Sequence, residues 1–178
     1  MGTMKFSDAV DAIGRELVVF LPTVADPLAV TVTEAKAAAT VHLTCNIRGF
    51  NATMEQTKTK RYRLCGKQGF DRLGRTDWSI ERLTFIDDPQ AEDDNPEYPH
   101  KSIVPGTRGY ILRRRGIEAD PADYVDFAAD QLYQLFPVQF GERQDVPVAP
   151  EEDGQEFEYL QEIAVTGTVV RGKLAAGA

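Results

Sequence analysis

Three consecutive arginines, Arg113, Arg114 and Arg115, form the most distinctive chemical run in the sequence. They end the segment 107–115, whose composition predicts a strand closed by Gly116. On a strand, Arg113 and Arg115 share one face while Arg114 points to the other. An ion-pair stripe between subunits and a solvated strand end both fit this pattern. A nucleic-acid patch is a weaker third interpretation, because no aromatic platform lies beside the run.

Acidic residues placed shortly after this run are candidate partners for it. Asp120, Asp123 and Asp126 belong to a block, 116–130, that carries five acids and no Lys or Arg. The preceding block, 101–115, carries five basic groups and no acid. Blocks of opposite sign on a folded domain can be complementary surfaces for neighbours, or simply solvated loops that maintain solubility.

The charge pattern continues on the N-terminal side of these blocks. Residues 61–86 carry six basic and three acidic groups, and residues 87–100 carry six acids without Lys or Arg. The net charge of the whole chain is −8. An acidic balance argues against tight nucleic-acid binding, which requires Lys and Arg to neutralise phosphates.

Constellations that would support catalysis or metal binding are absent from the sequence. There is no GxSxG, P-loop or GxGxxG motif, and the acidic run near residue 90 lacks the spacing of an EF-hand. His42 and His100 are expected to be ordinary surface residues. Cys45 and Cys65, without a CxxC motif, are expected to be small buried side chains, with a disulfide as the alternative. We therefore expect no enzyme, cofactor or metal site.

Length and hydropathy favour one folded domain over residues 1–178. The chain has 42% hydrophobic and 27% charged residues, an ordinary globular balance. No stretch approaches the roughly 20 apolar residues that cross a bilayer, and the N-terminus lacks a signal-peptide layout. We expect the chain to be made in a cytoplasm and to have no membrane partner.

Periodicity predicts six or seven strands. Residues 40–47 alternate, which predicts a half-buried strand, and 131–141 alternate around Pro137, which suggests an edge strand or a bulge. Further strands are expected over residues 16–21, 75–86, 107–115 and 156–170, the last with Gly167 as a possible bulge.

Helices, loops and termini complete the expected layout. Thr31 and Glu34 have capping-box spacing, which predicts a helix over about 32–39, and a second short helix is expected to open at Asp120. Residues 1–14 read as an N-terminal arm or short helix, and 172–178 as a frayed end. Long loops include the polar excursion 49–60, a glycine-punctuated loop at 66–74 and an acidic surface segment at 88–100. The fold class is mainly β, a two-sheet sandwich or barrel with one or two short flanking helices.

Six stretches stand in a characteristic order along the chain: VTVTEAKAA (30–38), the strand that reaches Cys45, RLCGKQGFDRLGRT (63–76), GTRGYILRRRGIE (106–118), FPVQFGERQDVPV (136–148) and EIAVTGTVV (162–170). This order resembles the tail tube (major tail) proteins of long-tailed bacteriophages that infect actinobacteria. The resemblance spans nearly the whole chain and depends on the order and spacing of its segments. Two segments depart from the pattern: 119–134 is unusually helical in character, and the acidic segment 87–100 is long.

The resemblance implies a structural virion protein with a two-sheet β fold of the tail tube type. Copies would form hexameric rings, and stacked rings would form the tube through which the genome leaves the virion. The implied partners are further copies of the chain and other tail proteins, namely the tape measure, tail terminator and distal tail proteins. Genomic DNA would pass through the lumen without specific binding. The implied locations are the host cytoplasm during assembly and the virion tail afterwards.

Residue-level hypotheses follow from this implied assembly. Arg108, Arg113 and Arg115 are expected to contact a neighbouring subunit, while a net negative surface faces the lumen and repels DNA. The polar excursion and the glycine-punctuated loop are candidate arms that reach the next subunit or ring. The arm residues named as inter-ring candidates are Phe50, Asn51, Met54 and Glu55.

Two other classes of function fit the sequence less well. A tail terminator or head–tail joining protein with a related β fold would form one ring and stop. A β-domain that binds a protein or carbohydrate would stay monomeric at high concentration. Filament growth of the purified protein distinguishes the tail tube from both.

Overall fold

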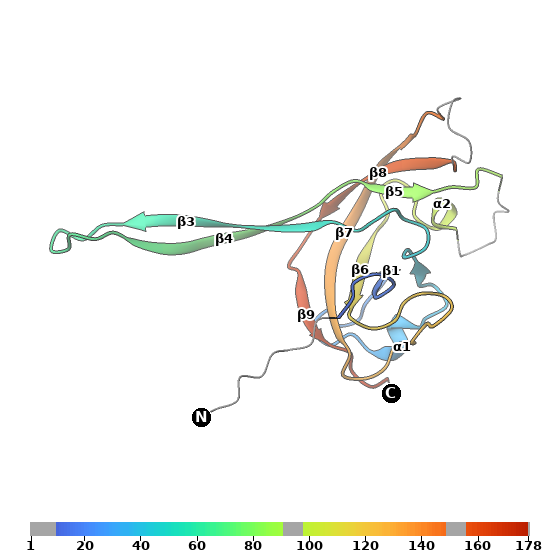
Figure 1. The fold of residues 1–178 in the computed structure, drawn as a ribbon, viewed down its shortest axis with the longest axis horizontal. Helices are drawn as coiled ribbons and strands as arrows, with labels where there is room; N and C mark the ends of the chain where they lie inside the picture. Colours follow the sequence, from blue (N-terminus) through green and yellow to red (C-terminus); the bar gives the residue numbers. More distant parts are fainter. Residues whose placement is uncertain (1–9, 91–97, 149–155, 178) are drawn as a thin grey trace.

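The structure, a computed structural model, describes residues 10–90, 98–148 and 156–177 (Figure 1). It is mainly β, with 45% strand and 5% helix, as the sequence predicts. The strands in these ranges are β1 (Glu16–Leu21), β2 (Val41–His42), β3 (Ala52–Arg61), β4 (Phe70–Ile80), β5 (Leu83–Ile86), β6 (Arg108–Arg115), β7 (Leu132–Asp145), β8 (Glu158–Val165) and β9 (Val170–Lys173). The helices are α1 (Val32–Ala35) and α2 (Pro99–Ser102).

Seven of the strands form one curled antiparallel sheet, six of them in the order β2-β1-β6-β7-β8-β5. Strand β9 also pairs with β7, further along the same edge that β8 occupies. The other two strands, β3 and β4, pair only with each other and form a long hairpin that projects away from the sheet (Figure 1).

Both faces of the curled sheet carry an apolar core, because its central strands are buried on alternate sides. One core contains Val18, Phe20, Ile111 and Phe136 and lies under β5 and the root of the hairpin. The opposite core contains Leu17, Leu112 and Leu135 among its members and lies under α1 and the 116–131 segment. Two covered faces explain why β1 reads as a continuous apolar run in the sequence.

The β3–β4 hairpin, called the arm below, confirms that residues 49–60 form an exposed arm. Nine of the ten β3 residues are exposed. The loop predicted at 66–74 is shorter than expected, because residues 62–69 make the turn of the hairpin and β4 already begins at Phe70. The register shifts once, between Gln56 and Lys58, where Gly74 approaches Thr57 so closely that a larger residue would clash. This bulge lets a glycine sit inside a long strand.

Strand β7 lies inside the sheet, so the edge position suggested by Pro137 is wrong. Leu135 is paired with β9 and Val138 with β8, and Pro137 lies in the gap between these two partners. The Pro137 carbonyl accepts a hydrogen bond from Thr166 N (2.9 Å). A residue without an N–H is tolerated at this point because no ladder hydrogen bond is required of it.

Three predicted strands prove to be discontinuous. The 40–47 segment forms a strand only at Val41–His42 and then turns. Leu43 and Ile47 remain buried, and Ile47 makes an isolated bridge to Phe85. The 75–86 segment is divided between β4 and β5, because Glu81 and Arg82 redirect the chain from the arm into the main sheet. The 156–170 segment is likewise divided between β8 and β9, so Gly167 lies in a connection and not in a bulge.

Helix prediction succeeded at one site and failed at another. The capping box of Thr31 and Glu34 is present, but α1 ends at Ala35 instead of near 39. No helix opens at Asp120, where residues 120–123 form turns and the following residues are irregular. The 116–130 block carries five acids and has few apolar residues at helical spacing, so its contacts with the sheet determine its path.

The termini and cysteines also differ from expectation. Leu174 is buried and Ala175 exchanges backbone hydrogen bonds with Val30 and Val32, so residues 172–176 are held and not frayed. Residues 10–14 form no helix, and the remainder of the predicted N-terminal element lies outside the described residues. Cys45 and Cys65 are exposed free thiols, which overturns the prediction of buried side chains. Within the described ranges, neither helix is long and apolar enough to span a lipid bilayer.

Candidate functional site

The arginine triplet at the end of β6 divides between the two faces of the sheet, as its strand position predicts. Arg113 is opposite Val18 and Arg115 opposite Glu16, on one face. Arg114 points to the other face and is 1% exposed. Adjacent residues of one type therefore have different environments because side chains alternate along a strand.

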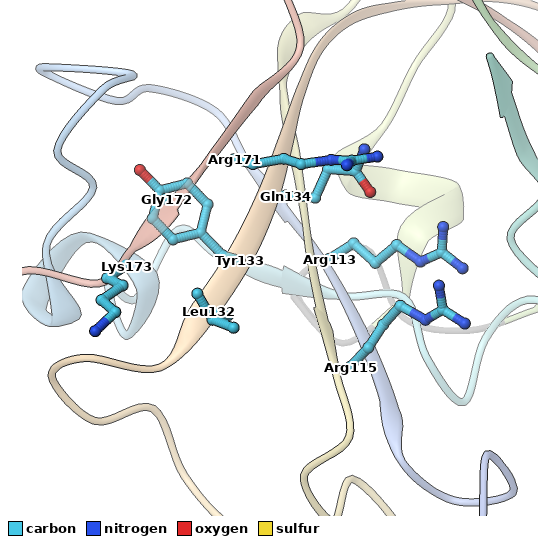
Figure 2. Close-up of a pocket in the computed structure, with 8 residues that line it drawn as sticks. All are labelled: Arg113, Arg115, Leu132, Tyr133, Gln134, Arg171, Gly172 and Lys173. Carbon is cyan, nitrogen blue, oxygen red and sulfur yellow. The ribbon is translucent and has the colours of Figure 1, made fainter. Parts of the chain in front are cut away.

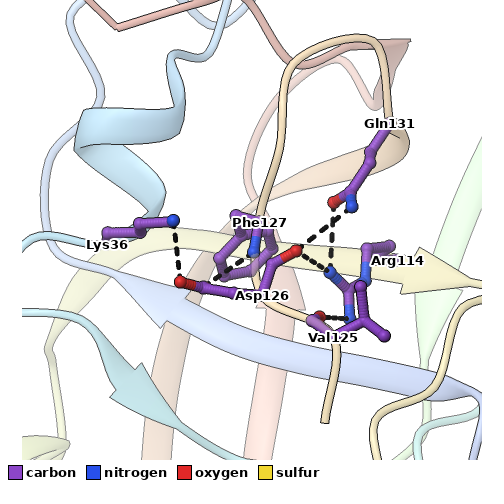
Figure 3. A network of polar contacts seen from close by, with 6 residues as sticks. All are labelled: Lys36, Arg114, Val125, Asp126, Phe127 and Gln131. Carbon is purple, nitrogen blue, oxygen red and sulfur yellow. Dashed lines mark hydrogen bonds and ion pairs between the residues drawn. The ribbon is translucent and has the colours of Figure 1, made fainter.

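Arg114 holds the irregular segment 116–131, called the acidic loop below, against the sheet (Figure 3). Its Nη2 donates to the carbonyl oxygens of Val125 (2.6 Å) and Glu118 (3.1 Å). Its Nη1 donates to the Asp126 carbonyl oxygen (3.2 Å) and to Gln131 Oε1 (3.1 Å). One guanidinium thus satisfies several carbonyl groups of a loop that has no regular structure of its own.

The surroundings of Arg114 balance the cost of burying a charge. Burial lowers the pKa of Arg114, and the nearby Tyr124 and Asp126 act in the opposite direction. The guanidinium also lies 5.2 Å from the centre of the Phe127 ring, a cation–π contact. Hydrogen bonding and ion pairing with Lys36 (2.7 Å) lower the pKa of Asp126, so that this carboxylate is engaged within its own chain.

The opposite face of the sheet carries an open basic hollow (Figure 2). The hollow has a volume of about 520 Å³. Arg113 pairs with Glu16 of the same chain and is mostly covered. Within the described residues, no carboxylate forms an ion pair with the other three cations, Arg115, Arg171 and Lys173.

Two arginines of this hollow also brace the root of the arm. Arg113 lies 5.5 Å from the centre of the Phe50 ring, and Arg171 lies 5.6 Å from that of Trp78. Both aromatic rings in turn meet Phe136 edge-on, at 5.4 and 5.6 Å. Since Phe50 precedes β3 and Trp78 belongs to β4, both strands of the arm are anchored on the sheet.

The predicted arm residues fall at this root and just beyond it. Phe50 packs against the core, whereas Asn51 is exposed. Met54 is 51% exposed and is paired with Trp78, while Glu55 is exposed and opposite Asp77. Phe50 therefore positions the arm, and the residues available to a neighbour lie further out.

The outer part of the arm combines positive charge with uncovered apolar groups. The arm, residues 52–80, contains seven Lys or Arg and three Asp or Glu, so its net +4 leaves −12 on the rest of the chain. Leu64 at the turn is 111% exposed, and Tyr62 is 76% exposed. Phe70 and Leu73 are each 60% exposed. Uncovered apolar side chains of this size on a thin hairpin indicate a surface that another molecule covers.

The remaining predicted contact residues lie on the surface but are not brought together within one chain. Arg108 is exposed at the start of β6, away from the basic hollow. Asp123 is exposed, and Asp120 is exposed while its Oδ1 accepts a hydrogen bond from Ala122 N (2.9 Å). These two aspartates lie on the acidic loop, on the face opposite the basic hollow.

Sequence reasoning missed Arg171, Lys173 and the structural role of Arg114. The alternation of Arg171 and Lys173 around Gly172 was a usable signal, because residues two apart share a face of a strand. The expectation that residues 172–178 are frayed excluded this strand from the prediction. The burial of Arg114 had no signal in the sequence, since it depends on the path of a loop.

A second polar cluster lies between α2 and strands β7 and β8. Arg143 Nη2 donates to the carbonyl oxygen of His100 (2.7 Å), and its guanidinium lies 4.9 Å from the centre of the Tyr159 ring. His100 Nδ1 is 3.0 Å from Asp87 Oδ1, so this histidine is not simply solvated as expected. Burial raises the pKa of Tyr159. The cluster ties a four-residue helix to the sheet, and in the described ranges no group of His, Cys, Asp and Glu could hold a metal ion.

Comparisons with known proteins give one family. The family model described as phage tail tube protein matches residues 4–178. A cryo-EM structure of the anti-feeding prophage baseplate, symmetrised six-fold, contains a chain that aligns with a TM-score of 0.48 and 9% identity, covering 94% of this chain and 97% of that chain. None of the curated proteins matches.

Proposed function

Because the chain belongs to the phage tail tube protein family, and is thus a structural protein of the virion tail and not an enzyme, we propose that it forms hexameric rings that stack into the tail tube. The genome leaves through the bore of this tube. The other proposed partners are the tape measure, tail terminator and distal tail proteins, and assembly takes place in the cytoplasm of an actinobacterial host.

The observation that carries this proposal is the uncovered arm. An isolated two-stranded hairpin is at best marginally stable in water, and this one displays Tyr62, Leu64, Phe70 and Leu73 to solvent. Such an element gains stability when a neighbouring copy covers it. The arm is rooted on one side of the body and projects well beyond it, so it reaches past its own subunit (Figure 1). We therefore assign the arm to contacts between stacked rings.

Charge separation supports an electronegative bore. The arm is net basic while the rest of the chain carries −12. Arms that dock on neighbouring bodies bury positive charge in subunit contacts and leave the acidic remainder to face the bore. Duplex DNA carries about one negative charge per 1.7 Å, so an acidic wall repels it and a basic wall would retain it.

Shortening the arm tests the proposal. In the variant, residues 57–75 are replaced by an Asn-Gly turn that joins Gln56 to Thr76, a directly opposed pair. The variant keeps Phe50 and Trp78, so the body retains its core. We expect negative-stain electron microscopy to show tubes for the concentrated wild type and no tubes for the variant.

The controls separate folding from assembly. The variant should unfold in urea with a midpoint close to that of the wild type, because little of the arm is buried. Tubes of normal length from the shortened chain would show that the arm is not required for the stacking of rings. Wild-type protein that forms single rings only would support a tail terminator or joining protein, and a persistent monomer would overturn the assembly proposal.

A further inference from the structure

The face of the sheet that carries the basic hollow is uncovered at one end. The register places residues of four neighbouring strands in rows across β1, β6, β7 and β9. The row Phe20–Ile111–Phe136 lies under the arm root. Away from that root, the next row is Val18–Arg113–Gln134–Arg171, and beyond it lie the pairs Glu16–Arg115 and Leu132–Lys173. The β6, β7 and β9 residues of these positions line the hollow.

The chemistry of the two open rows is that of an interface. Arg115, Arg171 and Lys173 have no ion-pair partner among the described residues, although the chain is acidic overall. Leu132, at the centre of the outer row, is 67% exposed. We call the surface formed by Arg115, Leu132, Arg171 and Lys173 the basic face. It combines unpaired cations with an apolar side chain that its own chain leaves uncovered.

The other side of the same sheet presents the opposite charge. The acidic loop is fixed there by Arg114 and by the burial of Ala119 and Phe127 in the core beneath it. Asp120 and Asp123 are exposed on this loop. Asp126 is already paired with Lys36, so it is less available to a neighbour.

We propose that the basic face of one copy seats the acidic loop of the next copy around the ring, with Asp120 and Asp123 opposite Arg115 and Lys173. This inference rests on the ring assembly proposed above and assigns the surfaces that close it. Complementary patches on opposite sides of one subunit make a heterologous contact, the type that generates a ring when its rotation closes. Oppositely charged patches also fix the orientation of the subunits.

A second copy fits the basic face better than nucleic acid does. The face is a small patch on a chain of net charge −8. Tyr133, the aromatic residue that lines the hollow, is only 4% exposed, so it offers no base-stacking platform. If the basic face lined the bore, its cations would hold the phosphates of the passing genome. When these cations are buried against an acidic neighbour, they cannot hold the passing DNA.

Two charge reversals test the pairing. One variant carries Arg115→Glu with Lys173→Glu, and the other carries Asp120→Lys with Asp123→Lys. Each creates like charges across every contact, so the concentration needed for ring formation should rise by about tenfold or more. In an equimolar mixture the two variants complement each other when they alternate, so the mixture should return to within about twofold of the wild type. Sedimentation velocity measures ring formation in each case.

A matched control changes the same charge elsewhere. The variant with Arg82→Glu and Lys101→Glu lowers the net charge by the same amount as Arg115→Glu with Lys173→Glu, but at positions outside the basic face. It should form rings like the wild type. Urea unfolding of all variants confirms that each is folded.

The outcomes separate this inference from the proposed function. If wild-type rings form and the Arg115→Glu, Lys173→Glu variant assembles equally well, the pairing is wrong while the tail tube role stands. Variants that fail singly and also fail when mixed would overturn the pairing of these two surfaces. Binding of a 20-bp duplex by the wild type at roughly 0.15 M salt, lost in the Arg115→Glu, Lys173→Glu variant, would assign the face to nucleic acid instead. A wild type that stays monomeric contradicts the ring itself.

Discussion

At the scale of single residues, the arginine triplet shows how strand geometry assigns different tasks to identical side chains. Arg113 pairs with Glu16 and braces Phe50, Arg114 is buried beneath the acidic loop, and Arg115 remains unpaired on the basic face. The sequence predicts the alternation. It does not predict that Arg113 is satisfied within its own chain, which leaves Arg115 as the stronger candidate for a subunit contact.

Arg114→Lys tests the task of the buried arginine. Lysine keeps the charge but has a single nitrogen, so it cannot reach the carbonyl oxygens of Glu118, Val125 and Asp126 together. We expect the free energy of unfolding in urea to fall by about 2–4 kcal/mol and limited proteolysis to cleave the acidic loop faster.

The neighbouring position offers a matched control for this substitution. Arg115→Lys should change the free energy of unfolding by less than about 0.5 kcal/mol, because the side chain is exposed. Equal and small effects at both positions would show that the hydrogen bonds of Arg114 contribute little to stability.

At the scale of elements, short segments depend on side chains to fix them. Helix α1 has four residues and would not form alone. Glu34 accepts hydrogen bonds from Ala25 N (2.8 Å) at one carboxylate oxygen and from Thr31 N (2.8 Å) at the other. The carboxylate thereby joins the helix to the proline-containing connection that precedes it.

The pKa of Glu34 leads to a prediction about acid sensitivity. The hydrogen bond from Ala25 N is the main cause that lowers this pKa from 4.5, with the Thr31 bonds contributing and burial opposing. A carboxyl with a lowered folded pKa stabilises the fold above its unfolded pKa, and this contribution is lost as the pH falls through the folded value. At neutral pH, Glu34→Gln should lower the free energy of unfolding by about 0.5–1.5 kcal/mol, because one of the two acceptor oxygens is lost.

The difference in the free energy of unfolding between wild type and Glu34→Gln should shrink as the pH falls below 4.5. Urea unfolding of both proteins in parallel at neutral and acidic pH measures it, and the comparison cancels the effect of all other carboxyl groups. A difference that stays constant across this range would mean that the charge of Glu34 does not contribute to the link.

At the scale of the whole molecule, charge is distributed unevenly over distinct surfaces. The arm and the basic face are positive, whereas the acidic loop and the rest of the body are negative. This arrangement is suited to association between copies, because positive surfaces meet negative ones while a net negative charge remains on the assembly.

The proposed tube predicts that assembly reduces contact with DNA. In free subunits the arm and the basic face are exposed, so a labelled duplex should bind weakly at low ionic strength, about 0.05 M, and dissociate near 0.15 M. In tubes these surfaces are covered. Co-sedimentation with assembled tubes should therefore recover less duplex per subunit than the free subunits bind. Equal or greater recovery would mean that basic surfaces remain open or line the bore.

The sequence alone determined the features that depend on local spacing. Alternating apolar residues and turn residues predicted a mainly β chain, the capping box predicted the start of α1, and polar composition predicted the exposed arm. These features depend on near neighbours along the chain, whose preferences persist in the fold.

Only the tertiary structure decided which residues act together. The basic face joins Arg115 to Arg171 and Lys173, far apart in the sequence, because β6 and β9 both pair with β7. The burial of Arg114 and the irregular path of the acidic loop depend equally on long-range packing. Local preference in the 119–134 segment favoured a helix, but hydrogen bonds from one buried guanidinium and the apolar contacts of Ala119 and Phe127 favour an irregular loop. Contacts between distant strands outweigh local propensities of a few tenths of a kcal/mol per residue.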